Sequence, residues 1–158
     1  MREAMRKSAR GILAAAVLIS SAVAAVAKDL NRLAKFVRPA YTAMNFAVMC
    51  ARDNPFFLAD TSGPRGTPLH YAEHVKNEAI NGLSEADAIT VLKIAAGAAR
   101  TTARRQLYGL AHANDDRGTA QAVRDWCDSS GKDFVLDFIR QHDVGHSQVI
   151  ESLQRAKQ

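Results

Sequence analysis

Two pairs of histidines are the residues of this chain whose type and spacing are best suited to chemistry. His70 and His74 form one pair, His142 and His146 form the other, and four positions separate the two members of each pair. In a helix this spacing places two imidazoles on the same face, close enough to bind one metal ion together. A divalent transition metal is therefore the first candidate ligand.

The first histidine pair lies on the polar face of its predicted helix. The apolar residues on the opposite face are Leu69, Ala72, Val75, Ala79, Ile80 and Leu83. Glu78 continues the polar line one turn further along. A solvated helix face is the simplest interpretation. The alternative is a surface site in which His70, His74 and Glu78 bind zinc, nickel, cobalt or copper.

The segment from His70 to His74 also has the form H-x-x-E-H, and in this respect it resembles the inverzincin metallopeptidases. The resemblance covers these five residues. It implies that His70 and His74 hold zinc and that Glu73 activates a water molecule. Because nothing in the sequence identifies a third ligand, we interpret the match as a coincidence and do not predict an enzyme.

The second histidine pair falls at the centre of an apolar stripe. If the last helix is continuous, this stripe includes Phe138 and Ile139, and both His142 and His146 are expected to face the interior. A buried neutral histidine needs hydrogen-bond partners, and the usual result is a satisfied core side chain. An inward metal site is one alternative. A break at Gly145 that releases His146 from the stripe is the other.

Two further features are candidates for binding. Lys93, Arg100 and Arg104 line one side of a long predicted helix, with Arg105 nearby. They form either a solvated basic face or a docking site for an anion or an acidic partner. The loop over residues 54–58 contains two adjacent phenylalanines that either fill the core or form a partner-binding patch. No motif marks a catalytic nucleophile.

The elements that must position these residues are helices throughout. Apolar positions recur at helical spacing from Leu30 to Asp53 and cover nearly all sides, which predicts a helix in the middle of a bundle. Pro39 is expected to kink this helix or to start a new one after Arg38.

Caps and breakers delimit the remaining helices. We expect helices over residues 68–81, 85–113, 119–128 and 132–155, with Thr67, Ser84 and Thr119 as caps and a break at residues 129–131. The expected inward stripe of the long helix is Ile89, Leu92, Ala95, Ala96, Ala99, Ala103, Leu107 and Leu110. Because no alternating strand pattern occurs, the prediction is an all-α, single-domain bundle of four to five helices.

The chain has two cysteines, Cys50 and Cys127. In an oxidising compartment an even pair is most simply a disulfide, here closing a loop of 77 residues. Two free or metal-ligating thiols are the alternative.

The first 27 residues have the pattern of a cleavable signal peptide. A basic stretch precedes an uncharged apolar stretch, and small residues at 25–27 suit a signal peptidase. Cleavage after Ala25 and retention as a membrane anchor are the alternatives. Cleavage after Ala27 leaves a helical domain over residues 28–158 and lowers the net charge from +5 to about +2, because four basic residues and one acidic residue are removed.

These observations predict a periplasmic or secreted protein with no membrane segment after cleavage. The low remaining charge gives no support for a nucleic-acid partner. We expect a non-catalytic interaction or accessory protein with an unidentified protein partner in the cell envelope. The alternative is a transition-metal-binding or metal-sensing protein that uses the histidine pairs, and a small hydrolase ranks third.

Overall fold

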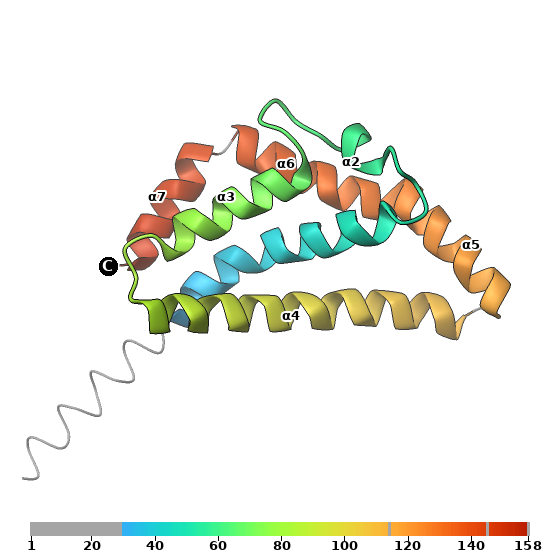
Figure 1. Ribbon diagram of the computed structural model, residues 1–158, viewed down its shortest axis with the longest axis horizontal. Coiled ribbons are helices and arrows are strands. Elements are labelled where there is room, and N and C mark those ends of the chain that lie inside the picture. Colours follow the sequence, from blue (N-terminus) through green and yellow to red (C-terminus); the bar gives the residue numbers. More distant parts are fainter. Residues whose placement is uncertain (1–29, 114, 145, 158) are drawn as a thin grey trace, which may run out of the picture.

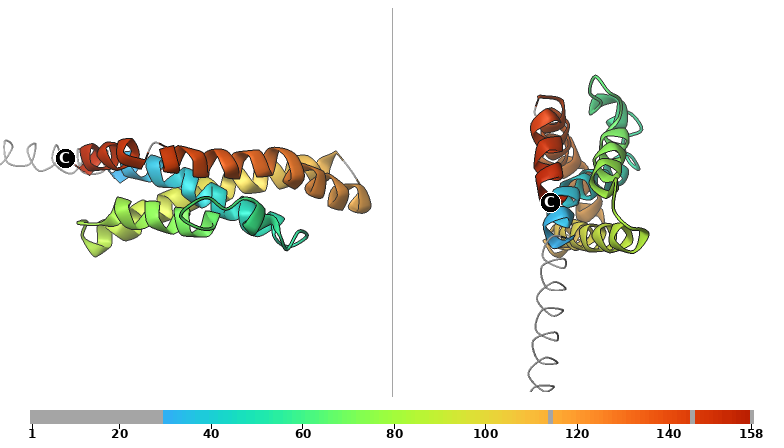
Figure 2. Two further views of the ribbon diagram at one scale, coloured as in Figure 1. Left: turned by 90° about the horizontal axis from the view of Figure 1, so that it is seen from above. Right: turned by 90° about the vertical axis from the view of Figure 1, so that its left-hand side faces the viewer.

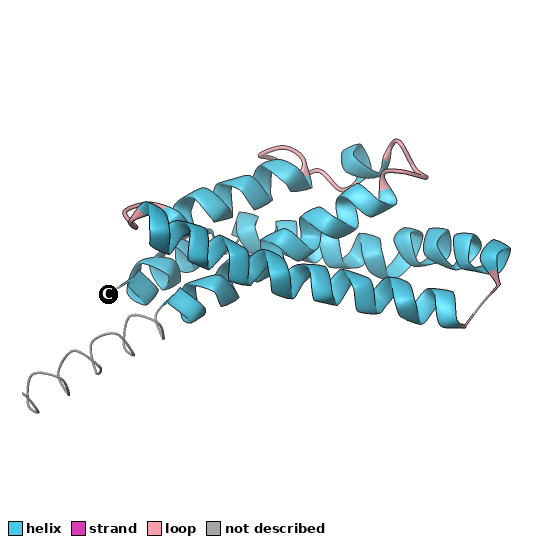
Figure 3. Cartoon of the chain, turned by 60° about the horizontal axis from the view of Figure 1, so that its bottom comes forward, coloured by secondary structure: helices cyan, strands magenta, loops and turns pink. Residues whose placement is uncertain are grey.

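The computed structural model describes residues 30–113, 115–144 and 146–157. The predicted signal peptide (1–27) lies outside these ranges, and so do the expectations about its cleavage or retention. Within them the regular elements are all helices, joined by short loops, and no strand is present (Figure 3). Also within these ranges, no helix combines the length and the hydropathy needed to cross a membrane. The all-α prediction is confirmed.

The helices follow one another closely along the chain. In order they are a helix over residues 30–50, α2 (Phe57–Asp60), α3 (Pro68–Ile80), α4 (Glu85–His112), α5 (Asp116–Trp126), the π-helix η1 (Cys127–Gly131), α6 (Lys132–Val144) and α7 (His146–Lys157). Because α5, η1 and α6 join without a gap, they form one long rod. With the helix over 30–50, α3, α4 and α7, this rod gives five helices longer than one turn among the described residues, but after residue 113 the boundaries differ from those of the predicted helices over 119–128 and 132–155.

The helix over residues 30–50 occupies the middle of the bundle. It runs between α4 on one side and α3, α6 and α7 on the other (Figures 1 and 2). Its fully or nearly fully buried residues are Leu33, Ala34, Val37, Ala40, Thr42, Ala43, Phe46, Ala47 and Cys50. This helix contributes to both hydrophobic clusters of the core, one around Phe138 and one around Val91.

This central helix is continuous through Pro39, so the expectation of a new helix after Arg38 is wrong. Val37, Ala40 and Ala43 are completely buried around the proline. Proline inside a helix costs about 3 kcal/mol, and the packing of the two flanking turns outweighs that cost.

The start of α5 also differs from the prediction. Its N-cap is Asp115, whose carboxylate accepts a hydrogen bond from the Gly118 backbone N–H at 2.7 Å. Thr119 lies inside the first turn. A carboxylate at this position also interacts favourably with the positive end of the helix dipole.

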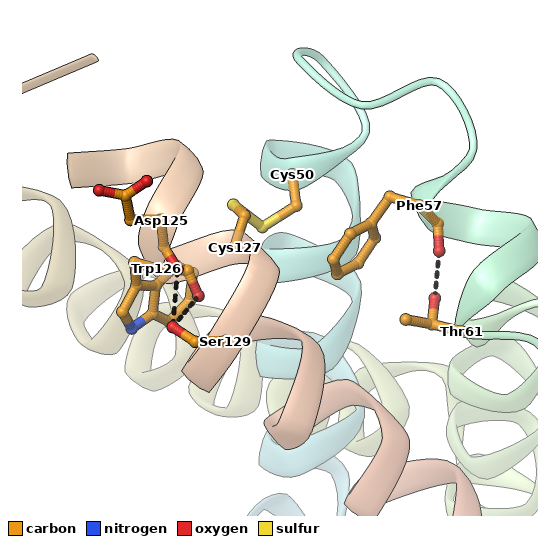
Figure 4. The surroundings of a disulfide bond; sticks show 7 residues. All are labelled: Cys50, Phe57, Thr61, Asp125, Trp126, Cys127 and Ser129. Carbon is orange, nitrogen blue, oxygen red and sulfur yellow. Dashed lines mark hydrogen bonds between the residues drawn. A yellow bond between two sulfur atoms is a disulfide. The ribbon is translucent and has the colours of Figure 1, made fainter. Parts of the chain in front are cut away.

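The expected break at residues 129–131 is wrong, because η1 connects α5 to α6 there. Gly131 permits a close approach rather than ending a helix: a Cβ at this position would lie 2.8 Å from Cζ3 of Trp126. The Ser129 hydroxyl donates to the Asp125 carbonyl at 2.6 Å, where the α-helical hydrogen bonding gives way to the π pattern (Figure 4).

The predicted helix over residues 132–155 is interrupted at the position where a break was one of the alternatives. α6 ends at Val144, α7 begins at His146, and the two run at an angle to each other (Figure 1).

A disulfide joins Cys50, at the end of the central helix, to Cys127 in η1, with 5.5 Å between the two Cα atoms. Both cysteines are buried and lie in one hydrophobic cluster with Phe57 (Figure 4). The predicted disulfide is confirmed. The adjacent Phe56 is 71% exposed, so only one phenylalanine of the pair fills the core.

Candidate functional site

A cavity of about 350 Å3 between α3 and α6 brings three of the five histidines together. It is lined by Arg65, His70, Tyr71, His74, Val75 and His142. His70 and His74 are exposed on α3, as their polar face predicts. His142 reaches the same cavity from α6, which sequence reasoning did not anticipate. We refer to this space as the histidine cavity.

His142 has the buried, hydrogen-bonded environment expected of a core histidine. The residue is 8% exposed. Its Nδ1 lies 2.7 Å from the Phe138 carbonyl oxygen. Because a carbonyl oxygen only accepts, the Nδ1 atom must carry a proton, and in the neutral ring Nε2 is then the acceptor. The imidazole also packs on the Phe138 ring at 4.3 Å between centroids.

His70 contributes to the start of α3. The Thr67 backbone N–H donates a long hydrogen bond to His70 Nδ1 at 3.4 Å. The turn before the helix needs Gly66, which has φ of +121° and whose added Cβ would lie 2.7 Å from the same Nδ1 atom. Part of the hydrogen-bonding capacity of His70 is therefore used in local structure.

A buried tyrosine fixes one wall of the histidine cavity. The Tyr71 hydroxyl donates to Asp143 Oδ1 at 2.6 Å and accepts from the Arg65 backbone N–H at 3.1 Å. Burial, followed by the hydrogen bond to Asp143, raises the pKa of Tyr71 above its usual value of 10.0. Gly63 passes so close that an added Cβ would lie 2.6 Å from Cγ2 of Ile139. These contacts hold α3 and the preceding loop against α6.

Of the five predicted metal ligands, His70, His74 and His142 line one cavity. Glu78 does not line the histidine cavity, and its backbone carbonyl accepts a hydrogen bond from Lys157 at 2.6 Å. The side chain of His146 lies outside the described part of the structure. Among the residues that are described, no group of three or more His, Cys, Asp or Glu side chains is arranged to hold a metal ion.

A second candidate surface lies on the outward side of α4. A shallow groove of about 750 Å3 is lined there by Thr101, Arg104, Arg105, Leu107, Tyr108, Gly109 and Ala111. Tyr108 is 67% exposed, and its ring stacks on His112 with 5.0 Å between centroids. We call Arg100 together with these lining residues the α4 outer face.

The position of Leu107 corrects the predicted inward stripe of α4. The buried residues of this helix are Val91, Ala95 and Ala99, whereas Leu107 is 38% exposed and Ile89 is also exposed. At about 100° per residue, Leu107 is turned roughly 120° away from Ala95. The predicted stripe combined positions that drift too far around the helix to share one face.

The cations of α4 beyond its first turn form no ion pair with the carboxylates of the described residues. No Asp or Glu occurs between residues 88 and 112, which include Lys93, Arg100, Arg104 and Arg105. All four side chains are exposed, and none takes part in an ion pair within the described ranges. Sequence reasoning identified these cations, but the neighbouring exposed Leu107 and Tyr108 were missed.

The histidine cavity and the α4 outer face differ in what they can do chemically. The first offers imidazoles that are already partly engaged in structural hydrogen bonds. The second offers guanidinium groups that form no ion pair with another described residue, beside exposed apolar side chains. In comparisons with known proteins, the chain matches no family model, no curated protein and no solved structure.

Proposed function

We propose that this protein is exported and acts without catalysis, as a module that binds an acidic protein partner in the cell envelope through the α4 outer face. One observation carries the proposal: arginines that form no ion pair with another described residue lie beside exposed Leu107 and Tyr108 on one side of α4. Arginine and tyrosine are among the residues that most often dominate binding energy in protein interfaces.

The chemistry of this face defines the partner. Arg104 and Arg105 can each form two parallel hydrogen bonds with a carboxylate. Tyr108 and Leu107 offer apolar area between and beside them. The complementary surface therefore combines Asp or Glu side chains with apolar residues, as the face of an acidic amphipathic helix does.

Export is supported by two independent features of the chain. The first 27 residues have the charge and apolar pattern of a signal peptide. The buried Cys50–Cys127 disulfide is of the kind that persists in oxidising compartments. N-terminal sequencing of protein from the envelope fraction is expected to give a chain that starts at Lys28.

The test places a photo-crosslinking amino acid at position 108 in the full exported chain. The expected result is one specific crosslinked partner. Its binding to the purified wild type should weaken with salt, and its binding to Arg104→Glu protein should be at least roughly tenfold weaker. The matched control is Arg117→Glu, which reverses an exposed charge on α5 and should leave binding unchanged. No crosslink, or equal loss in both variants, contradicts the proposal.

A transition-metal-binding protein is the second candidate function. The observation in its favour is that His142 joins His70 and His74 at one cavity. The stripped protein is titrated with zinc, nickel, cobalt and copper in a calorimeter. Under the first proposal no tight binding is expected. Micromolar or tighter binding that is lost in the His70→Ala/His74→Ala variant would replace the first proposal with the second.

A further inference from the structure

A second cavity, of about 460 Å3, lies where the central helix, α4 and α6 meet. The central helix contributes Lys35, Arg38, Pro39 and Thr42, α6 contributes Phe134, Asp137, Phe138 and Gln141, and α4 contributes Thr102. In Figure 1 the central helix lies between α4 and α6. The volume falls within the range of small-molecule sites, about 300–1,000 Å3.

Helical spacing makes two facing walls. Residues 35, 38, 39 and 42 follow the spacing i, i+3, i+4 and i+7 and therefore share one side of the central helix. Residues 134, 137, 138 and 141 do the same on α6. Each wall has polar and apolar parts, so the cavity can hold a ligand that has both.

The apolar part of the cavity is aromatic. The Phe138 ring is buried, and Phe134 is 38% exposed beside it. Phe134 is held in place by an edge-to-face contact with Phe46, at 5.2 Å between ring centroids. An exposed aromatic ring that is fixed by packing loses little conformational freedom when it covers the apolar body of a ligand.

The polar part of the cavity is cationic. Lys35 and Arg38 are exposed, and neither forms an ion pair with another residue of the described ranges. The one lining carboxylate, Asp137, is already paired with Arg140 at 3.0 Å. Two positive charges that form no ion pair with a described residue therefore lie beside an aromatic wall.

From this combination we infer that the cavity binds a small organic anion made of a carboxylate and an apolar body, such as a medium-chain fatty acid. The carboxylate lies at Lys35 and Arg38, and the hydrocarbon covers Phe134 and Phe138. This inference is separate from the proposed partner binding, because the α4 outer face shares no lining residue with this cavity.

The experiment titrates the full exported chain with decanoate, below the concentration at which it forms micelles. Decyltrimethylammonium has the same chain with the opposite charge, and acetate has the same charge without the chain. Calorimetry measures the affinity, and the changes in amide NMR chemical shifts locate the residues that surround the bound ligand. Of the three compounds, we expect only decanoate to bind. Its binding should change the amide chemical shifts of Thr42, Thr102 and Gln141.

Substitutions make the test specific. Lys35→Gln/Arg38→Gln removes two exposed cations and is expected to weaken decanoate binding roughly tenfold. Arg104→Gln/Arg105→Gln removes two exposed cations from α4 and should leave the affinity for decanoate unchanged. Circular dichroism confirms that both variants fold. Absent decanoate binding, equal binding of decyltrimethylammonium, shifts confined to α4 or equal loss in both variants would overturn the inference.

Discussion

At the scale of single residues, Tyr71 links the loop before α3 to α6. Its hydroxyl is the shared partner of Asp143 and the Arg65 backbone, 72 and six residues away along the chain. Removing the hydroxyl leaves a carboxylate without its donor and a backbone N–H without its acceptor. This tyrosine therefore allows a direct test of how the histidine cavity is held together.

Tyr71→Phe is expected to lower the free energy of unfolding by about 1–2 kcal/mol at neutral pH. It should also change the response to alkali. Because the pKa of Tyr71 is raised in the folded protein, the unfolded chain loses this proton first as pH rises past about 10. Stability from this group is thus complete below pH 10 and declines above it.

Urea unfolding measured between pH 7 and 11 checks this expectation. The wild type should lose more stability than Tyr71→Phe above pH 10. Tyr108→Phe, which changes an exposed tyrosine on α4, is the control and should behave like the wild type. An identical alkaline decline in wild type and Tyr71→Phe would refute the role assigned to Tyr71.

The sequence predicted the environment of individual histidines better than their grouping. The polar face of α3 and the apolar stripe of α6 correctly placed His70 and His74 outside and His142 inside. That His142 shares a cavity with the other two depends on how α3 packs against α6. Periodicity within one helix contains no information about that contact.

At the scale of elements, η1 carries the chain from α5 into α6 and brings Cys127 to Cys50. Local signals correctly predicted the starts of α3 and α4, because capping by Thr67 and Ser84 involves only neighbouring residues. The same reasoning failed at Gly131, where the indole of Trp126 packs against the glycine and the helix continues. At Pro39 one of the two expected outcomes, a new helix, does not form, because buried contacts of the flanking turns outweigh the local tendency to end a helix.

Two glycine substitutions separate these effects. Gly131→Ala places a methyl group against the Trp126 indole and is expected to destabilise the protein by about 1–3 kcal/mol. Gly97→Ala, in α4, meets no atom within 4 Å and is expected to stabilise it by about 0.5–1 kcal/mol. Denaturant unfolding of both variants gives the comparison. If Gly131→Ala were as stable as Gly97→Ala, the close approach of Trp126 would be ruled out.

At the scale of the whole molecule, the disulfide ties the end of the central helix to the α5–η1–α6 rod. Closing this loop of 77 residues lowers the conformational entropy of the unfolded chain, which stabilises the folded protein by about 4 kcal/mol. The double variant Cys50→Ala/Cys127→Ala is expected to lose about that much unfolding free energy. Adding a reductant to the wild type should produce the same loss, whereas the variant should not respond to it.

The result that contradicts this prediction is a wild type whose unfolding is the same with and without reductant.

The fold class could be predicted from helical periodicity, and the cysteine pairing could be predicted because the chain has two cysteines and a signal-peptide pattern that points to an oxidising compartment. The α4 outer face could not be predicted in full, because it depends on which side of the long helix the bundle covers.

The same disulfide has a topological consequence. With residues 50 and 127 joined, the chain between them is a closed covalent ring that contains α3 and α4. Arg65, whose side chain is 49% exposed, lies in the loop before α3. A single tryptic cut there would open the ring without separating the pieces. The nicked protein would migrate as one molecule on a non-reducing gel and as two after reduction.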